Sequence, residues 1–500
     1  MPTESLTIVS PPGHSPGSGG PGNRLTRREL LRRAGSSLAL LASGPLLAGD
    51  VAPHRIGTTS RFVSRPDLVA PRVLVTGTSG GVHGYVFLAA MIGPGQHGPM
   101  IVDQDGQLVW LHPVPGAATA NFGVQTYRGQ QVLAWWEGQQ TDGHGAGDYV
   151  IADSGYREIR RVRAGRGLTG DLHEFIISPS DTALLSAYQA RPADLSAVGG
   201  PRNGTLLDCV VQEVDFATGR VLFEWSAAEH VPLRESYAAY AGGAYDFFHL
   251  NSIDFRADSD DLLISARHTW TVYNISRRTG QIRWRLGGKS PDFASGPGAR
   301  FYWQHDARWQ PDGTITIFDD GDGLTKNEPL SRGIRIALNT ARGTSRLVDS
   351  YTHPGYLADA MGSMQLLAGG GAFVGWGTVP AFTSFRPDGS TGIDGYVVGG
   401  GISYRTSLSS WAGQPAGRPA VAIARRHGQP HAYASWNGAT AVAAWRLNTG
   451  QAPGSLRPER TIAASGFETA MPLSSGARYL NVDALDAAGQ QLASSAPIPG

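Results

Sequence analysis

Three histidines recur at matching places in the sequence, and each could act as a nucleophile, a proton carrier or a metal ligand. His173, His249 and His305 stand about nine to thirteen residues before successive copies of a short apolar segment. An imidazole has an unperturbed pKa of about 6.5, so near neutral pH it can attack an electrophile or exchange a proton. Three such side chains in repeat register indicate one shared site.

Two further side chains near these histidines could hold an anion. Asn251 follows His249 by two positions, and Arg267 ends the next predicted strand. An amide donates hydrogen bonds, and the planar guanidinium group can bind two oxygens of an oxyanion at once. A histidine nucleophile beside such donors suits the transfer of a tetrahedral, anionic group.

A metal site is the alternative chemistry for clustered histidines. It would need a carboxylate beside neutral imidazoles, and Glu174 and Asp306 each directly follow one of the histidines. Neighbouring residues of a strand point to opposite faces, so we expect both carboxylates to point away from the histidines. The sequence therefore favours a site without a metal, and we predict no cofactor.

A repeat that runs from about residue 60 to residue 405 must position these side chains. Each copy holds two predicted hairpins, and one of them turns at an Asx and Gly pair such as Asp103 with Gly106. The copies lie roughly 50 to 60 residues apart, which is the length of a four-stranded propeller blade. We therefore predict an all-β fold with a six-bladed β-propeller over residues 60–405; five or seven blades are the alternatives.

Rotation about a propeller axis brings equivalent residues of successive blades to one mouth of the channel. We therefore expect His173, His249 and His305 to converge. The equivalent places in other copies hold Phe122 and either Met361 or Met364. Aromatic side chains could wall the site or pack in the core, and the candidates are Phe122, Tyr302, Trp303 and Trp376.

The residues after the repeat follow a different pattern. Residues 410–500 contain short alternating strands and a turn at Trp436, Asn437 and Gly438. A span of about 90 residues suits a fibronectin-like or immunoglobulin-like β-sandwich. We predict a small C-terminal accessory sandwich, with a peripheral β-extension of the propeller as the alternative.

The first residues predict an export signal. Within residues 1–49, the pair Arg27 and Arg28 precedes an apolar run from Leu38 to Ala48, the pattern of a twin-arginine (Tat) signal peptide. The run is too short to span a bilayer, which takes about 20 apolar residues. No cysteine follows it closely, so we expect no lipoprotein anchor. The protein is expected to be secreted or to stay at the cell envelope.

Charge and cysteine content exclude several other functions. The chain has 42 Lys and Arg against 41 Asp and Glu, so it lacks the basic excess that binds nucleic acid or anionic membranes. Cys209 is the only cysteine, which rules out an intrachain disulfide and a cysteine-based zinc site. We therefore expect small-molecule partners, and the sequence leaves the oligomeric state open.

The segments around the histidines resemble the arylsulfotransferase family, in its exported actinobacterial and fungal branch. The resemblance is carried by FHLNSID, ISARHTWTVYNI, WRLGG and QHDARW, followed by GSMQLL and FVGWGTVPAFTSF. It extends from about Phe62 to Tyr404. It implies a six-bladed propeller that moves a sulfuryl group from a phenolic sulfate ester to a phenol, without the nucleotide sulfate donor PAPS.

The resemblance also implies roles for single residues. His305 would be sulfated transiently in a ping-pong cycle, Arg267 would bind the sulfate, and His249 with Asn251 would form the His-x-Asn pair of the family. His173 would be the remaining active-site histidine. Either His249 or His173 would protonate the departing phenolate and later deprotonate the acceptor phenol. Enterobacterial members depend on a disulfide, which a single cysteine cannot form.

Two other functions stay open at the level of sequence. An exported propeller without enzymatic activity would bind aryl sulfates or sulfated glycans through Arg267 and the histidines. A quinone-dependent dehydrogenase is disfavoured, because its calcium ligands have no counterpart here: Asp319, Asp320 and Asp322 are interpreted as a turn.

Overall fold

Nearly all regular structure in the described part of the chain is β-strand. The computed structural model describes residues 57–78, 83–256, 259–321, 329–474 and 476–500. Helix within these ranges is limited to α2 (Ala227–His230) and the 3-10 turns Ser196–Val198 and Leu233–Glu235. The all-β prediction is confirmed. Residues 1–49, with the predicted export signal, lie outside the described residues.

Six groups of four antiparallel strands account for most of the sheets in the described residues. The second group is β7 (Ala118–Tyr127), β8 (Gln130–Thr141), β9 (His144–Ala152) and β10 (Glu158–Val162); the third is β11 (Gly170–Ile177), β12 (Thr182–Ala193), β13 (Gly204–Asp215) and β14 (Val221–Ser226); the fourth is β16 (Leu250–Phe255), β17 (Asp261–Ala266), β18 (Thr271–Ser276) and β19 (Ile282–Gly287). The fifth is β21 (His305–Trp309), β22 (Ile315–Asp319), β23 (Arg332–Asn339) and β24 (Thr344–Thr352), and the sixth is β25 (Ser363–Leu366), β26 (Ala372–Gly375), β27 (Ala381–Phe385) and β28 (Thr391–Val397).

The first group joins the two ends of the repeat. Its strands β4 (Tyr85–Ala90), β5 (Gly98–Val102) and β6 (Leu108–Leu111) follow one another, but the strand on the free side of β4 is β29 (Ser403–Ser409), from more than 300 residues later. Similarly, β3 (Val73–Gly77) pairs with β28 of the sixth group. Both ends of the repeat are therefore held in sheets that they share.

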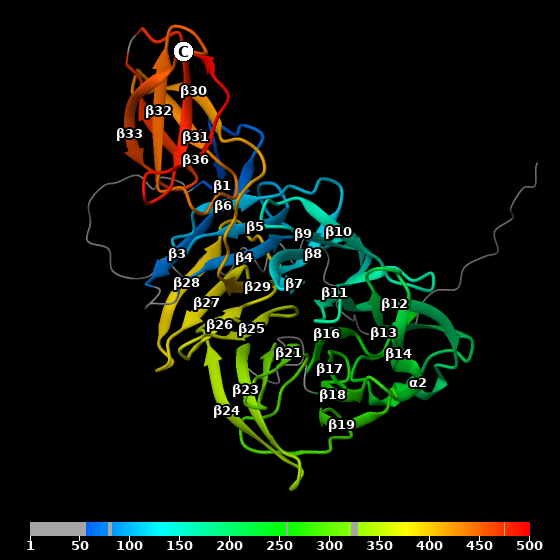
Figure 1. The fold of residues 1–500 in the computed structure, drawn as a ribbon. Helices are drawn as coiled ribbons and strands as arrows, with labels where there is room; N and C mark the ends of the chain where they lie inside the picture. Colours follow the sequence, from blue (N-terminus) through cyan, green and yellow to red (C-terminus); the bar gives the residue numbers. More distant parts are fainter. Residues whose placement is uncertain (1–56, 79–82, 257–258, 322–328, 475) are drawn as a thin grey trace, which may run out of the picture. The chain divides into compact units, whose positions relative to one another are not determined.

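The first strands of the six groups form a closed series. Each of β7, β11, β16, β21, β25 and β29 contacts the next, and β29 contacts β7. In Figure 1 these strands surround a common centre, and the later strands of each group lie farther out. The second and third groups also share one bridge, between Gly147 of β9 and Gly170 of β11.

The predicted turns fall between the third and fourth strands of the groups. In the first of them, Oδ1 of Asp103 accepts hydrogen bonds from the main-chain nitrogens of Asp105 and Gln107, and Gly106 supplies a positive φ of 79°. Such an Asx turn reverses the chain between two apolar strands, and glycine adopts this backbone conformation without a steric cost. The Asx and Gly spacing in the sequence therefore locates these hairpins.

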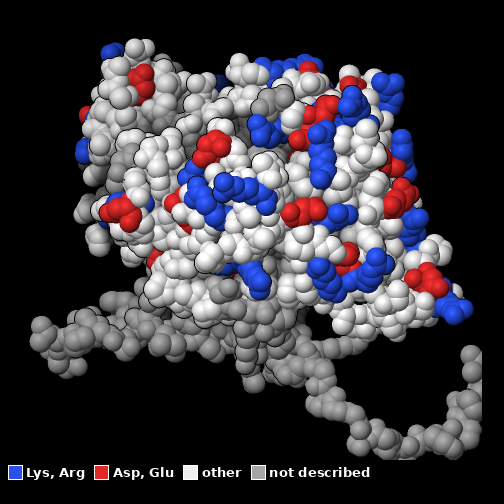
Figure 2. All heavy atoms as spheres, turned by 90° about the horizontal axis from the view of Figure 1, so that it is seen from below, with Lys and Arg blue, Asp and Glu red and all other residues white. Residues whose placement is uncertain are grey.

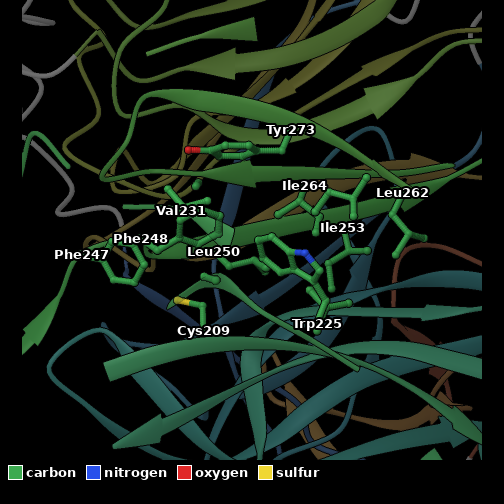
Figure 3. Close-up of a cluster of buried hydrophobic side chains, with 14 of the residues drawn as sticks. Cys209, Trp225, Val231, Phe247, Phe248, Leu250, Ile253, Leu262, Ile264 and Tyr273 are labelled. Carbon is green, nitrogen blue, oxygen red and sulfur yellow. The ribbon is translucent and has the colours of Figure 1, made fainter. Parts of the chain in front are cut away.

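A large apolar cluster packs between the third and fourth groups. Figure 3 shows its side chains, among them Cys209, Trp225, Phe247 and Phe248, all at most 1% exposed. Cys209 is thus a buried core residue that packs among apolar side chains. The same cluster fixes the chain on both sides of His249, because Phe248 and Leu250 are fully buried.

A buried network of charges joins all six first strands. Arg405 of β29 donates to Glu174 of β11 and Asn121 of β7 and pairs with Asp306 of β21. It also donates to the main-chain oxygen of Asn251 in β16. The Asp306 carboxylate accepts from the main-chain nitrogen of Met364 in β25. Arg308 of β21 completes the network by pairing with Glu174 at 2.6 Å and with Asp306 at 2.8 Å.

The residues after β29 form two further sheets. One contains β30 (Ala420–Arg426), β31 (Gln429–Ser435) and β34 (Glu468–Pro472); the other contains β32 (Ala444–Gly450), β33 (Arg457–Ala463), β35 (Tyr479–Leu485), β36 (Gln491–Ser494) and β37 (Ile498–Pro499). Buried side chains of both sheets, such as Ala432, Trp445 and Val482, belong to one apolar cluster. The predicted domain boundary near residue 410 stays a prediction.

Charged side chains on the surface are mixed in sign. On the face in Figure 2, basic and acidic residues alternate rather than gather into one patch. Several arginines are paired with a carboxylate, as Arg335 is with Asp312 and Asp349. No helix in the described residues is long and apolar enough to cross a membrane.

We predict that Arg405→Met lowers the free energy of unfolding by about 3 to 5 kcal/mol, because it leaves the Glu174 carboxylate buried with half of its cationic partners lost. Urea denaturation followed by circular dichroism measures this. The matched control is Arg163→Met, which removes an arginine whose side chain is 74% exposed and should cost at most about 1 kcal/mol. Equal effects of the two substitutions would show that the buried network does not stabilise the fold.

Candidate active site

The structure brings the three predicted histidines together at the start of neighbouring first strands. His173 lies in β11, His249 directly precedes β16, and His305 begins β21. The ring centroids of His173 and His249 are 4.8 Å apart. The ring of Tyr404, from β29, lies 5.4 Å from His173 and 6.3 Å from His305. The register of the repeat thus located the cluster correctly.

Each of these histidines is hydrogen bonded through Nδ1 to a carboxylate. The pairs are His173 with Asp171 at 2.5 Å, His249 with Asp246 at 2.5 Å and His305 with Asp320 at 2.7 Å. An ionised carboxylate only accepts hydrogen bonds, so the proton of each ring lies on Nδ1. Nε2 is then the nitrogen available for chemistry in all three rings.

Sequence reasoning did not identify any of the three carboxylates. Asp171 and Asp246 stand just before their histidines and also accept from the main-chain nitrogens of His173 and His249, both at 3.0 Å. A D-x-H or D-x-x-H spacing was the available signal. Asp320 was interpreted only as part of a turn; it directly follows β22, is fully buried and accepts a hydrogen bond from Nδ1 of His305. Asp322 lies outside the described residues.

The backbone around the site adopts costly conformations. His249, Trp303, Asp306 and Met361 all have positive φ angles, between 52° and 71°. Residues other than glycine rarely adopt this region, and such strain concentrates where the surroundings must hold a side chain in one direction. At His249 this conformation is maintained by the two hydrogen bonds that the residue donates to Asp246 and by the buried neighbours Phe248 and Leu250.

Burial keeps the imidazole rings of His305 and His249 neutral. It lowers the pKa of His305 well below the usual range, and the positive charge of Arg267 lowers that pKa further. Burial also lowers the pKa of His249 to about 3, although the Asp246 carboxylate acts in the opposite direction. Near neutral pH both rings therefore present an unprotonated Nε2, which can act as a nucleophile or as a base.

Main-chain groups of residues 359–361 contact His305 and Arg267. The nitrogen of Met361 donates to Nε2 of His305 at 3.2 Å, and Nη2 of Arg267 donates to the oxygen of Asp359 at 2.8 Å. The Arg267 guanidinium also lies over the ring of Trp303, 4.6 Å from its centroid. A ligand that reaches His305 and Arg267 must exchange these main-chain hydrogen bonds for its own.

Asn251 and the two predicted outward carboxylates have structural partners. Nδ2 of Asn251 donates to the main-chain oxygen of Gln304 at 2.6 Å, so this side chain fixes the residue before His305. Glu174 and Asp306 bind the arginines of the buried network. Nδ1 of His173 and Nδ1 of His305 are bonded instead to Asp171 and Asp320. These contacts agree with the expectation that Glu174 and Asp306 point away from the histidines.

Two histidines that the sequence did not single out border the same site. Nε2 of His144 lies 3.0 Å from Oδ2 of Asp246, and the ring of His268 lies 4.7 Å from that of His249. Ligand atoms of His144, Asp246 and His249 lie within 4.8 Å of one another, a spacing that could hold a metal ion. Among the described residues this is the group whose spacing could hold a metal ion, and it includes neither Glu174 nor Asp306.

The four candidate aromatic residues divide between core and site. Phe122 and Trp376 are buried in apolar clusters, so they pack the core. Tyr302 lies against Trp270, 5.1 Å between ring centroids. Trp303 borders the site through its contact with Arg267.

The family model described as Arylsulfotransferase (ASST) matches residues 123–396, more than half of the chain. This chain belongs to the arylsulfotransferase family. The matched residues include His173, His249, His305 and Arg267. No curated protein matches the sequence.

Solved structures similar to this arylsulfotransferase family member are distant. A protein of unknown function from Bacteroides caccae is 13% identical with a TM-score of 0.41, and the match covers 65% of this chain and 99% of that chain. Virginiamycin B lyase from Staphylococcus aureus is 9% identical with a TM-score of 0.33, over 65% and 88% of the chains. The Dos1 propeller is 11% identical with a TM-score of 0.32, over 67% and 79%. At these TM-scores the matches do not bear on the site.

We predict that His249 and His305 take up no proton between pH 8 and pH 5, because burial lowers the pKa of both rings. Below about pH 6.5 the unfolded chain binds protons at these rings that the folded protein does not. Each ring then lowers the free energy of unfolding by about 1.4 kcal/mol per pH unit as the pH falls. Histidine NMR signals of the folded and the denatured protein measure the titrations, and a midpoint above pH 5 for either folded ring would contradict the prediction.

Proposed function

We propose that this arylsulfotransferase family member transfers a sulfuryl group from a phenolic sulfate ester to a second phenol through a covalent intermediate on His305. The observation that carries the proposal is the environment of this ring. The ring is buried and neutral, its Nδ1 proton is directed at Asp320, its Nε2 accepts from the main-chain nitrogen of Met361, and burial and the charge of Arg267 lower its pKa. A neutral imidazole nucleophile beside a guanidinium group suits attack on a sulfate ester.

In the first half of the proposed cycle, Nε2 of His305 attacks the sulfur as the bond from sulfur to the phenolic oxygen breaks. The ring becomes positively charged, and the Asp320 carboxylate stabilises that charge through the Nδ1 proton. Arg267 binds the nonbridging sulfuryl oxygens, on which charge is spread in a loose transition state. The phenolate leaves with both electrons of the broken bond and accepts a proton from His173.

The second half returns the enzyme to its first state. The acceptor phenol gives its proton to Nε2 of His249 as its oxygen attacks sulfur, and the bond from sulfur to His305 breaks. The neutral state of His249 fits this role as a base, and it does not fit protonation of the departing phenolate. We therefore assign protonation of the departing phenolate to His173, which regains its proton from His249 at the end of the second half, and Asn251 positions the His305 segment through Gln304.

The fold and location of the protein enter the proposal as well. We propose that the six groups of strands are the six blades of a propeller, that residues 410–500 form a separate sandwich, and that the active site lies where the first strands of the blades begin. The closed series of first strands and the shared sheets at the ends of the repeat support this reading.

We predict that His305→Ala abolishes transfer from an aryl sulfate such as 4-nitrophenyl sulfate to phenol, because no other group replaces the nucleophile. Release of 4-nitrophenol with phenol present measures the reaction, and the wild type should give the parallel double-reciprocal lines of a ping-pong mechanism. The matched control is His427→Ala, which removes an exposed histidine of the C-terminal residues. Full activity of His305→Ala would contradict the assignment of the nucleophile. Tight aryl sulfate binding by the wild type without turnover would instead favour a binding protein.

We also propose export through the Tat pathway, on the basis of Arg27 and Arg28. Replacing both with lysine should block export, because the pathway reads the arginine pair. Mature protein in the extracellular and envelope fractions, compared between wild type and the double variant, measures this. Equal amounts in those fractions would contradict the proposal.

A further inference from the structure

One hairpin of the second group, β8–β9, is longer than the corresponding hairpin of the fourth group and reaches the candidate active site. Strands β8 and β9 have 12 and 9 residues, whereas the corresponding β17 and β18 of the fourth group have 6 each. The added length ends in a tight turn at Asp142 and Gly143, both with positive φ, as a two-residue hairpin turn requires. His144 and Gly145 directly follow this turn.

The tip of the hairpin donates hydrogen bonds to two of the carboxylates that hold active-site histidines. Nε2 of His144 lies 3.0 Å from Oδ2 of Asp246, the same oxygen that accepts from Nδ1 of His249. The main-chain nitrogen of Gly145 donates to Oδ1 of Asp171 at 2.7 Å, and Asp171 holds His173. His144 thus contacts the Asp246–His249 pair, and the adjacent Gly145 contacts the Asp171–His173 pair.

The packing of the tip leaves little room for another arrangement. A Cβ atom at Gly145 would lie 2.7 Å from the main-chain nitrogen of Leu172 and 2.6 Å from the Trp136 ring. Glycine is therefore required for this main chain to approach β11. The His144 ring packs against Tyr188 at 4.4 Å and His249 at 5.3 Å between centroids.

The charges around His144 suit a protonated donor. Burial lowers its pKa, but the hydrogen bond and charge of Asp246, assisted by Asp171, raise it above the usual value overall. The other groups that face it are Tyr188 of β12 and His249. With N–H groups of both rings directed at Asp246, His249 stays in the form that carries its proton on Nδ1.

We propose that His144 is a positioning residue of the active site, which acts through Asp246 to hold His249 with its unprotonated Nε2 toward the other histidines, while Gly145 holds Asp171 and His173 in the same way. The effect of His144 on turnover rests on the proposed function of His249 as a base. The hydrogen-bond arrangement itself does not depend on that function.

The test compares wild type, His144→Ala, His144→Gln and the control Gln140→Ala, an exposed residue of the same hairpin. We expect His144→Ala to lower kcat for transfer from 4-nitrophenyl sulfate to phenol by about 10- to 100-fold, the range for loss of a group that orients a working side chain. KM for the donor should change little. Without the charge of His144, the Asp246 carboxylate raises the pKa of His249 more strongly. The acid limb of the pH profile should therefore move to higher pH. His144→Gln keeps an N–H donor and should recover most of the activity.

A second measurement uses histidine-labelled protein without substrate. We expect the Nδ1 proton of His249 to give a signal in wild type, in Gln140→Ala and in His144→Gln, and to weaken or disappear in His144→Ala. An unchanged signal and unchanged kcat in His144→Ala would overturn the proposal. Thermal stabilisation of the wild type by Zn²⁺ alone, absent in His144→Ala, would also overturn it, because a metal would then join these residues. A wild type without turnover would contradict the proposed function, and the NMR comparison would still decide the role of His144.

Discussion

The buried pairing of Arg405 and Arg308 with Glu174 and Asp306 is the interaction on which the rest of the structure depends. Each group of strands begins with a strand that faces the others, and main-chain pairing within a group cannot hold these six strands to one another. The charged network does so, with contacts to every first strand. Because it contains two cations and two anions, its burial does not leave a net charge. Burial raises the pKa of Glu174, yet the two arginines outweigh this and hold it at about 2, so this carboxylate stays ionised at any physiological pH.

The active site uses the same strands at their beginnings. Glu174 follows His173 and Asp306 follows His305, so alternation along β11 and β21 gives one residue of each pair to the network and the other to the histidine cluster. The network thus fixes the main chain from which the histidines project. A carboxylate on each Nδ1 then fixes the ring itself and leaves Nε2 for reaction. Burial keeps the His249 and His305 rings neutral, and the permanent cation Arg267 acts on His305, within a chain whose overall charge is close to zero.

Much of the fold and part of the site followed from the sequence. Alternating apolar residues and the Asx and Gly spacing are local signals, so they located strands and hairpins, and repeat register located His173, His249 and His305. Asp320 could not be assigned in this way, because its contact with His305 spans 15 residues and depends on how β21 and β22 pair. His144 reaches the site only through the length of the β8–β9 hairpin. Asn251 was expected to bind substrate, but its amide donates to the main-chain oxygen of Gln304. No sequence spacing predicts this contact.

The central claim is that the sulfuryl group passes through His305, and its most direct test is to trap that state. Wild-type protein is mixed with excess 4-nitrophenyl sulfate without a phenol acceptor, quenched, digested and analysed by mass spectrometry under conditions that preserve the labile bond from nitrogen to sulfur. The account predicts an added mass of about 80 Da, one SO3 group, on the peptide that contains His305, lost when phenol is added before the quench. An adduct on His249 or His173, or the same adduct in His305→Ala, would contradict it.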